Sequence, residues 1–473
     1  MKASKVSAAK AAPLSAPPLE QAVVELVQEL TPDRLGPEAR VAVSTLMRDQ
    51  LAVQIGSSRL PWSKQILTFA AKRQLPGRSS VVGSQLKMSA TDAAFVNAVY
   101  GHGFEYDDAH RVSASHPGCC VVPTALALGE ELDASLDEVI TALVVGYEVY
   151  TRIGNLAAPD LLQRGFHPHA VLSVFGAAAI TAKLRRFDAE TTLNTLAIAL
   201  SHASGTGEFT STGGSVKRVH SGIGVRSGMA SADMAEAGIT GPRAFLSGTK
   251  GFYRTFLQKT VSEQDTRRFY LAGTLEVQKL WLKPYCCCGC IHAYIDAIRP
   301  FAPRVSEIES VVARIQRSAN VVVGTVNANA YTPKNIEHVQ FSLPIQMAFT
   351  MLGLGNGYRV HLDYLEGRVD MEAVMATAER IRIIEDQELD RKYPGKFVAD
   401  LTVEFRDGSS EQMFVEDSIG TLDNPIPAAE HDAKFFELTS GVLGTVQAER
   451  LREALFALDP QMRAAELAAL CRA

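Results

Sequence analysis

SHASGTGEFTSTGGSVKRVHSGIGVRSG, residues 201–228, is the stretch on which the interpretation of the whole chain depends. It is rich in Gly, Ser and Thr, and the glycines allow a backbone with positive φ that approaches a ligand closely. It also carries Lys217, Arg218, His220 and Arg226 within ten residues. An apolar helix is predicted before it and a run of small residues follows. Cations on a pliable loop between two packed helices suit a small anion such as a carboxylate, although a solvated basic loop has the same composition.

The composition is that of a globular protein and excludes two kinds of partner. The chain has 473 residues, of which 47% are hydrophobic and 21% charged, and this length allows a large domain with a smaller one attached. The net charge of −5 gives no general attraction to nucleic acid. The longest apolar runs carry polar breaks and are too short to span a membrane.

The N-terminus and the cysteines indicate where the protein works. Residues 1–20 contain three Lys, much Ala and Pro, and no apolar segment of the kind found in secretory signals. We expect a disordered tail there, with a short organelle-targeting peptide as the alternative. Seven Cys, several of them adjacent in sequence, argue against a disulfide framework and for a reducing cytoplasm.

Periodicity predicts a mainly α protein: a large all-α helical domain with an inserted smaller α+β lid domain. Residues 21–282 show almost only helical patterns, with a capping box at Ser135 and Glu138 and an N-cap at Asp188. Residues 283–416 add alternating, strand-like segments at 311–317, 381–384 and 397–405, then a hairpin signal and a return strand at 412–415. Residues 417–473 return to helix and complete the helical domain.

A second group of candidate residues lies between two predicted helices, in the segment 101–120, GHGFEYDDAHRVSASHPGCC. Its acidic residues are Glu105, Asp107 and Asp108, which could be metal ligands, helix caps or a general base. Because His110 and Arg111 lie beside them, an internal polar network is the default interpretation. Eight of the eleven His lie between 102 and 292, mostly in such loops at helix ends, where functional residues concentrate.

The segment Lys283–His292, KPYCCCGCIH, invites a metal interpretation that its spacing does not support. Structural zinc takes two separated ligand pairs, and Cys119–Cys120 is a poor second pair. Lys283 and His292 lie where the helical body meets the inserted domain, and ligands often bind between domains. Since nucleotide-binding and metalloprotease motifs are also absent from the sequence, we expect chemistry without metal or cofactor.

Taken together, these stretches resemble the MmgE/PrpD family of 2-methylcitrate dehydratases, cis-aconitate decarboxylases and iminodisuccinate epimerase. The matching landmarks, in chain order, are Asp92–Asn97, Tyr106-Asp107-Asp108 with His116-Pro117, Gly146-Tyr147-Glu148 with Arg152, Gly165-Phe166-His167, Gly214–Gly222, Gly238–Pro242, and Lys283–Cys286 with His292. The resemblance implies a helical domain, a smaller lid, an active site between them, and a homodimer.

The resemblance also implies roles for individual residues. His116 and His167 match active-site histidines, Lys217 and Lys283 match substrate-binding or acid/base lysines, and His292 matches a histidine on the lid side. The remaining predicted substrate-binding residues are Glu105, Asp107, Arg218, His220 and Tyr331, the last matching a lid tyrosine of the decarboxylases. Glu105 replaces an Asp of the family and Ala109 a Thr, and the loop to His116 is a residue longer than in the decarboxylases.

The family's reactions share one difficulty, because breaking a bond next to a carboxylate builds further negative charge. Converging lysines would stabilise that charge, and a histidine can move a proton near neutral pH. We predict a cofactor-independent lyase acting on a small di- or tricarboxylate by proton abstraction next to a carboxylate, first of all a dehydratase. The alternatives are an epimerase or isomerase of a dicarboxylate, a cis-aconitate-type decarboxylase, and a carboxylate-binding protein without activity.

Overall fold

The computed structural model describes residues 17–73, 76–158, 160–270, 274–392 and 395–473. The predicted disordered tail falls mostly on residues 1–16, which lie outside the described residues. Helix α1 begins at Pro18, so the last residues of the predicted tail are helical. Within the described ranges, no helix combines the length and apolar character that a membrane span requires.

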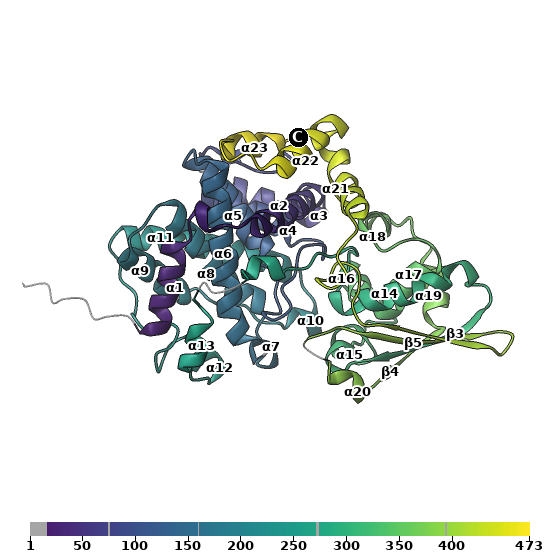
Figure 1. Cartoon of the computed structure of the whole chain (residues 1–473). Helices are drawn as coiled ribbons and strands as arrows, with labels where there is room; N and C mark the ends of the chain where they lie inside the picture. The colour runs from purple at the N-terminus through teal and green to yellow at the C-terminus, as the bar shows by residue number, and fades with distance from the viewer. Residues whose placement is uncertain (1–16, 74–75, 159, 271–273, 393–394) are drawn as a thin grey trace, which may run out of the picture.

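The first half of the chain is a helical body around one large apolar core (Figure 1). Two short paired strands, β1 (Ser79–Ser80) and β2 (Lys87–Met88), are the exception to the all-α prediction. The helices of this part are α1 (Pro18–Glu29), α2 (Pro37–Ser57), α3 (Pro61–Ala71), α4 (Ala90–Gly101), α5 (Gly118–Glu131), α6 (Leu136–Ala157), α7 (Asp160–Gln163), α8 (Pro168–Leu184), α9 (Ala189–Leu200), α10 (Phe209–Thr212), α11 (Val216–Glu236), α12 (Phe252–Leu257) and α13 (Glu263–Arg267), with 3₁₀ turns η1 (Pro32–Arg34) and η2 (Glu276–Lys279).

The helix starts follow from their local sequence. Ser135 and Glu138 form the predicted capping box at the start of α6, and the Asp188 carboxylate accepts the Thr191 N–H at the start of α9. Both caps satisfy amide N–H groups that have no partner within the helix.

The prediction of a pliable loop over residues 201–228 is wrong for its second half. Helix α11 begins at Val216, so Lys217, Arg218, His220 and Arg226 lie on a helix. The glycines of this helix allow close packing: a Cβ at Gly224 would lie 2.4 Å from the Ser173 Cβ of α8. Positive φ occurs just before the helix, at Gly213 (83°) and Gly214 (109°), where glycine adopts it without strain.

The second half of the chain builds a mixed sheet with its own core. The strand order is β4-β3-β5-β6, and the pair β3–β4 is parallel while the others are antiparallel. Helix α14 packs against β5 and β6. The strands are β3 (Ile308–Ile315), β4 (Ile381–Glu385), β5 (Ala399–Phe405) and β6 (Ser410–Val415), and the helices are α14 (His292–Ile298), α15 (Arg317–Val323), α16 (Ile336–Gln340), α17 (Leu343–Met351), α18 (Tyr358–Leu365), α19 (Met371–Ala378) and α20 (Gln387–Asp390), with 3₁₀ turns η3 (Gly289–Ile291) and η4 (Arg299–Arg304).

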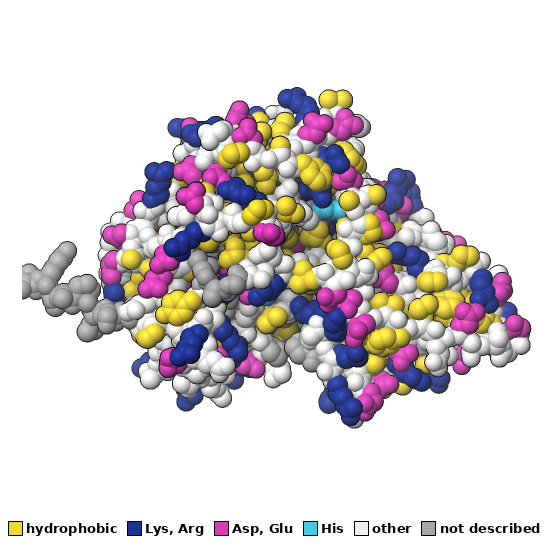
Figure 2. Space-filling view, viewed as in Figure 1, with side chains coloured by type: hydrophobic (Ala, Val, Ile, Leu, Met, Phe, Trp, Pro, Cys, Tyr) yellow, Lys and Arg dark blue, Asp and Glu magenta, His cyan; other side chains and the backbone are white. Residues whose placement is uncertain are grey.

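The chain then returns to the helical body. Helix α21 (Ala428–Leu443) packs against α2, α22 (Thr445–Ala457) against α2 and α21, and α23 (Ala464–Leu470) against α5, as the yellow helices in Figure 1 show. Figure 2 shows basic and acidic side chains interspersed over the visible face, in keeping with the small net charge of −5.

Candidate active site

The candidate site is built on the loop between α4 and α5, which holds an unusual backbone conformation. Glu105 has φ of 57°, a left-handed conformation that is uncommon and costly for a residue with a side chain and that concentrates at functional sites. Ala109 and Trp281 exchange backbone hydrogen bonds of 2.9 and 3.0 Å. This bridge fastens the loop to the strand-like segment that carries Lys283.

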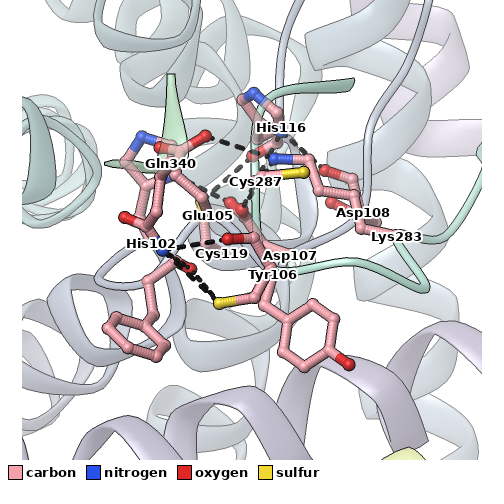
Figure 3. A network of polar contacts seen from close by, with 12 residues as sticks. His102, Glu105, Tyr106, Asp107, Asp108, His116, Cys119, Lys283, Cys287 and Gln340 are labelled. Atoms are coloured by element: carbon pink, nitrogen blue, oxygen red, sulfur yellow. Dashed lines mark hydrogen bonds and ion pairs between the residues drawn. The ribbon is translucent and has the colours of Figure 1, made fainter. Parts of the chain in front are cut away.

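The carboxylate of Glu105 lies between two lysines that are far apart in sequence. Lys217, in the first turn of α11, forms an ion pair with one Glu105 oxygen. Lys283 Nζ lies 3.3 Å from the other oxygen and 3.8 Å from Asp107 Oδ1 (Figure 3). All four side chains are buried, so their charges interact more strongly than they would in water.

His116 joins this cluster through Asp107. Its Nδ1 lies 3.9 Å from Asp107 Oδ1 and 2.7 Å from the Asp108 carbonyl oxygen. Burial and the charge of Lys283 lower the pKa of His116 to about 3, so the ring is neutral at neutral pH. Burial alone would raise the pKa of Asp107, but His116, His102 and Lys283 hold it well below its usual value. The site therefore pairs a carboxylate with a neutral imidazole.

Asp108, next to Asp107 in the chain, has a structural role. Its carboxyl oxygens accept hydrogen bonds from the Gly118 N–H at 2.9 Å and the Tyr147 hydroxyl at 3.0 Å, and so anchor the start of α5. Burial and the nearby charge of Asp107 raise the pKa of Asp108 to about 8.

Four more histidines extend the cluster. His167 and His220 face each other with their Nδ1 atoms 2.9 Å apart, which places both predicted residues together. His102 and His169, which sequence reasoning did not single out, lie behind them with ring centroids 4.4 Å apart. The signal that could have found them is their position beside helix ends that also carry predicted residues: His102 follows α4, and His169 opens α8 two residues after His167.

The remaining predicted residues are used differently. Arg218 pairs with Glu337, donates to the Gly103 carbonyl at 3.0 Å and stacks over the Trp62 ring. His292 is fully buried, with its Nε2 3.3 Å from the Cys287 carbonyl oxygen. The Tyr331 hydroxyl donates to the Ile381 carbonyl at 2.7 Å. The structure brings Arg218 to the edge of the cluster, and burial and the charge of Lys283 lower the pKa of His292 to about 3. The Tyr331 hydroxyl is bonded to the sheet.

A cavity of about 610 Å³ opens beside Lys217 and Glu105, between the helical body and the segment 321–341. Glu105, Lys217 and Arg218 line one side of it. Val321 and Val326 line the other, and they are 54% and 59% exposed. A larger cavity of about 940 Å³ lies between α1, α6 and α8, and its arginines 185, 186 and 463 all pair with carboxylates. The smaller cavity therefore combines cations, a carboxylate and an apolar wall.

A buried lysine of α21 binds both the loop of Glu105 and the segment of Lys283. Lys434 Nζ donates to the carbonyl oxygens of Tyr106 and Lys283, each at 2.9 Å, and lies 2.7 Å from Asp49 Oδ1. One ammonium thus fixes the backbone next to Glu105 and Asp107 and the backbone of Lys283 itself.

Two domain models of one known protein family match most of the chain. A model of the MmgE/PrpD N-terminal domain matches residues 21–264, and one of the MmgE/PrpD C-terminal domain matches residues 285–459. The chain belongs to the MmgE/PrpD family. This membership confirms the resemblance drawn from the sequence and supports an enzyme of the lyase type.

Individual relatives in this family are distant. Cis-aconitate decarboxylase of Aspergillus terreus (strain NIH 2624 / FGSC A1156) is 24% identical over 436 residues, 88% of each chain. Cis-aconitate decarboxylase-like protein oryM of Aspergillus oryzae (strain ATCC 42149 / RIB 40) is 26% identical over 467 residues, 94% of this chain and 95% of the relative. Human cis-aconitate decarboxylase is 32% identical over 194 residues, 39% of this chain and 40% of the human protein.

Proposed function

We propose that this protein is a lyase that removes water from a small hydroxy di- or tricarboxylate by taking a proton from the carbon next to a carboxylate. The observation that carries the proposal is the meeting of Lys217 and Lys283 at one carboxylate, that of Glu105, beside an open cavity. Burial lowers the pKa of Lys217 well below its usual value, but the ion pair with Glu105 favours the ammonium form. Two ammoniums held around a carboxylate position are suited to the extra negative charge that forms when the proton leaves.

The other groups supply proton transfer. His116 is neutral and so accepts the substrate proton, and Asp107, 3.9 Å away, stabilises the imidazolium that results. The electrons of the broken C–H bond form the double bond as the C–O bond breaks. A lysine ammonium gives a proton to the leaving hydroxyl, so that the substrate loses one water and becomes an alkene.

A second candidate is a decarboxylase of the cis-aconitate type. The named relatives favour it, and so does the apolar wall of Val321 and Val326, because a carboxylate held against apolar groups is not stabilised by charge. In that reaction a C–C bond breaks, carbon dioxide leaves, and the carbon takes up a proton.

A panel of di- and tricarboxylic acids, followed by NMR in heavy water, separates the candidates. A new alkene with every carboxylate retained supports the dehydratase, and loss of a carboxylate supports the decarboxylase. Deuterium uptake without loss of substrate indicates an epimerase. No change in any acid, with protein that is folded, would contradict an enzymatic role and leave carboxylate binding as the function.

The homodimer and the cytoplasmic location remain predictions from the sequence. Light scattering on the purified full-length chain tests the first, and a mass equal to one chain would contradict it.

A further inference from the structure

Three metal-binding side chains meet behind the candidate active site. The donor atoms of His102, Cys119 and His169 all lie within 4.8 Å of one another, and each residue is buried. They come from the end of α4 and the first turns of α5 and α8, so 67 residues separate the first from the last. Sequence spacing could not reveal this group, because no two of its members are neighbours in the chain.

One of the three donor separations matches that of tetrahedral zinc. Zn–N bonds of about 2.0–2.1 Å and Zn–S bonds of about 2.3 Å place tetrahedral donors about 3.3–3.6 Å apart. Cys119 Sγ and His169 Nε2 are already 3.5 Å apart. The donor atom of His102 lies within 4.8 Å of both. One thiol and two imidazoles select zinc or a related transition metal over magnesium or calcium, which take oxygen ligands.

His102 provides a second, independent indication. Its Nδ1 lies 2.7 Å from Asp107 Oδ2, which makes Nδ1 the protonated atom and leaves a lone pair on Nε2. That Nε2 is buried and has no hydrogen-bond partner among the described residues, although buried polar atoms are nearly always paired. A histidine that donates one N–H to a carboxylate and points its other nitrogen at a metal is a frequent pattern in metal sites.

His169 has a matching outer partner. Its Nδ1 lies 2.8 Å from the Tyr150 hydroxyl, and a metal on Nε2 selects the tautomer in which Nδ1 donates to that oxygen. The metal also requires Cys119 as a thiolate, so binding releases the thiol proton to solvent. The thiolate and the Asp107 carboxylate would together balance the charge of the dication.

We propose that His102, Cys119 and His169 bind one zinc ion. The described residues supply three ligands to it, which is the number found in zinc sites that keep a position open for water or substrate. The site lies next to Asp107, which the proposed reaction also uses, but it does not depend on that reaction. Its test is metal binding and not turnover.

The test uses the full-length chain, stripped of metal with a chelator and titrated with Co²⁺, which reports its ligands by absorption. We expect one Co²⁺ per chain, with the d–d bands of a tetrahedral site and a thiolate-to-cobalt charge-transfer band. Cys119→Ser should lose the charge-transfer band. Cys120→Ser is the matched control, because its thiol is also buried but donates to the Ser173 carbonyl oxygen, and this variant should keep the band.

A second variant decides the question if Cys119→Ser does not fold. Tyr150→Phe removes the outer partner of His169 and should weaken Co²⁺ binding by about 10–100-fold with unchanged bands. Absence of a charge-transfer band in the parent, a band that persists in Cys119→Ser, or equal Co²⁺ affinity in Tyr150→Phe and the parent would each overturn the proposal.

Discussion

Replacing Lys217 by Met tests the central feature of the proposed mechanism. Met keeps the apolar stem of the lysine and removes the ammonium, which lies 4.9 Å from the centroid of the Phe341 ring. An ammonium about 4 Å from the charge that develops on the substrate stabilises it by about 4 kcal/mol at an effective dielectric constant of 20. That free energy corresponds to about a thousandfold in rate, and single stabilising donors in enzymes account for about 10²–10³. We therefore expect turnover to fall by about 10²–10³.

The fold should survive this change, because Glu105 keeps Lys283 as a partner at 3.3 Å. The assay is steady-state turnover of the substrate found by NMR, together with the thermal unfolding midpoint. Lys217→Arg should not restore turnover fully, since a planar guanidinium does not replace a compact ammonium in a tight site.

Lys183→Met is the matched control for this experiment. Its ammonium donates to the Val27 and Gln28 carbonyl oxygens in the other, larger cavity, so turnover should stay close to that of the parent. Turnover of Lys217→Met within a few-fold of the parent, in folded protein, would refute the electrostatic role of the lysine.

Three further predictions concern the rest of the site and the fold. Lys283→Ala should keep the fold and lose activity, and a collapse of its thermal midpoint would show that the lysine is structural. Tyr331→Phe removes a hydrogen bond to the Ile381 carbonyl, so the unfolding free energy should fall by about 0.5–1.5 kcal/mol. Turnover should stay unchanged, and a large loss of turnover would instead support the predicted role of Tyr331 in substrate binding. Acid should destabilise the protein, because burial lowers to about 3 or 4 the pKa of the histidines 116, 220, 292 and 361. As pH falls below about 6.5 the unfolded chain takes up protons that the folded chain does not, so the unfolding free energy should fall by up to about 1.4 kcal/mol per pH unit for each of them; a flat denaturation profile between about pH 6.5 and 5 would contradict this.

Much of the fold could be predicted from the sequence, because its signals are local. The caps at Ser135 and Asp188 and the alternating pattern of β5 each depend on residues a few positions apart. The start of α11 could not be predicted in the same way. Its glycines suggested a flexible loop, but Gly224 and its neighbours are small because α8 packs against them. Only the tertiary contact distinguishes a glycine that permits packing from one that permits a turn.

The sequence allowed candidate site residues to be named one by one, but it could not show how they contact one another. Lys217 and Lys283 were both expected, and the structure shows that one carboxylate joins them. The commitment of the Tyr331 hydroxyl to the sheet and the burial of His292 follow from packing in the second core. The same is true of His102 and His169, whose importance depends on neighbours that are distant in sequence. A contact between two residues that are 67 positions apart produces no periodic pattern in the sequence.

The position of Lys434 has a consequence for how the protein is made. This residue donates to backbone oxygens 151 and 328 positions earlier in the chain. Domains emerging from the ribosome fold from the N-terminus, at about 5–20 residues per second. The helical body can gather its core early, but the loop of Glu105 and the segment of Lys283 receive their shared tether only once α21 has been synthesised. The nascent chain therefore carries Glu105 and Lys283 through the synthesis of the intervening residues without the tether that joins their two segments in the folded protein.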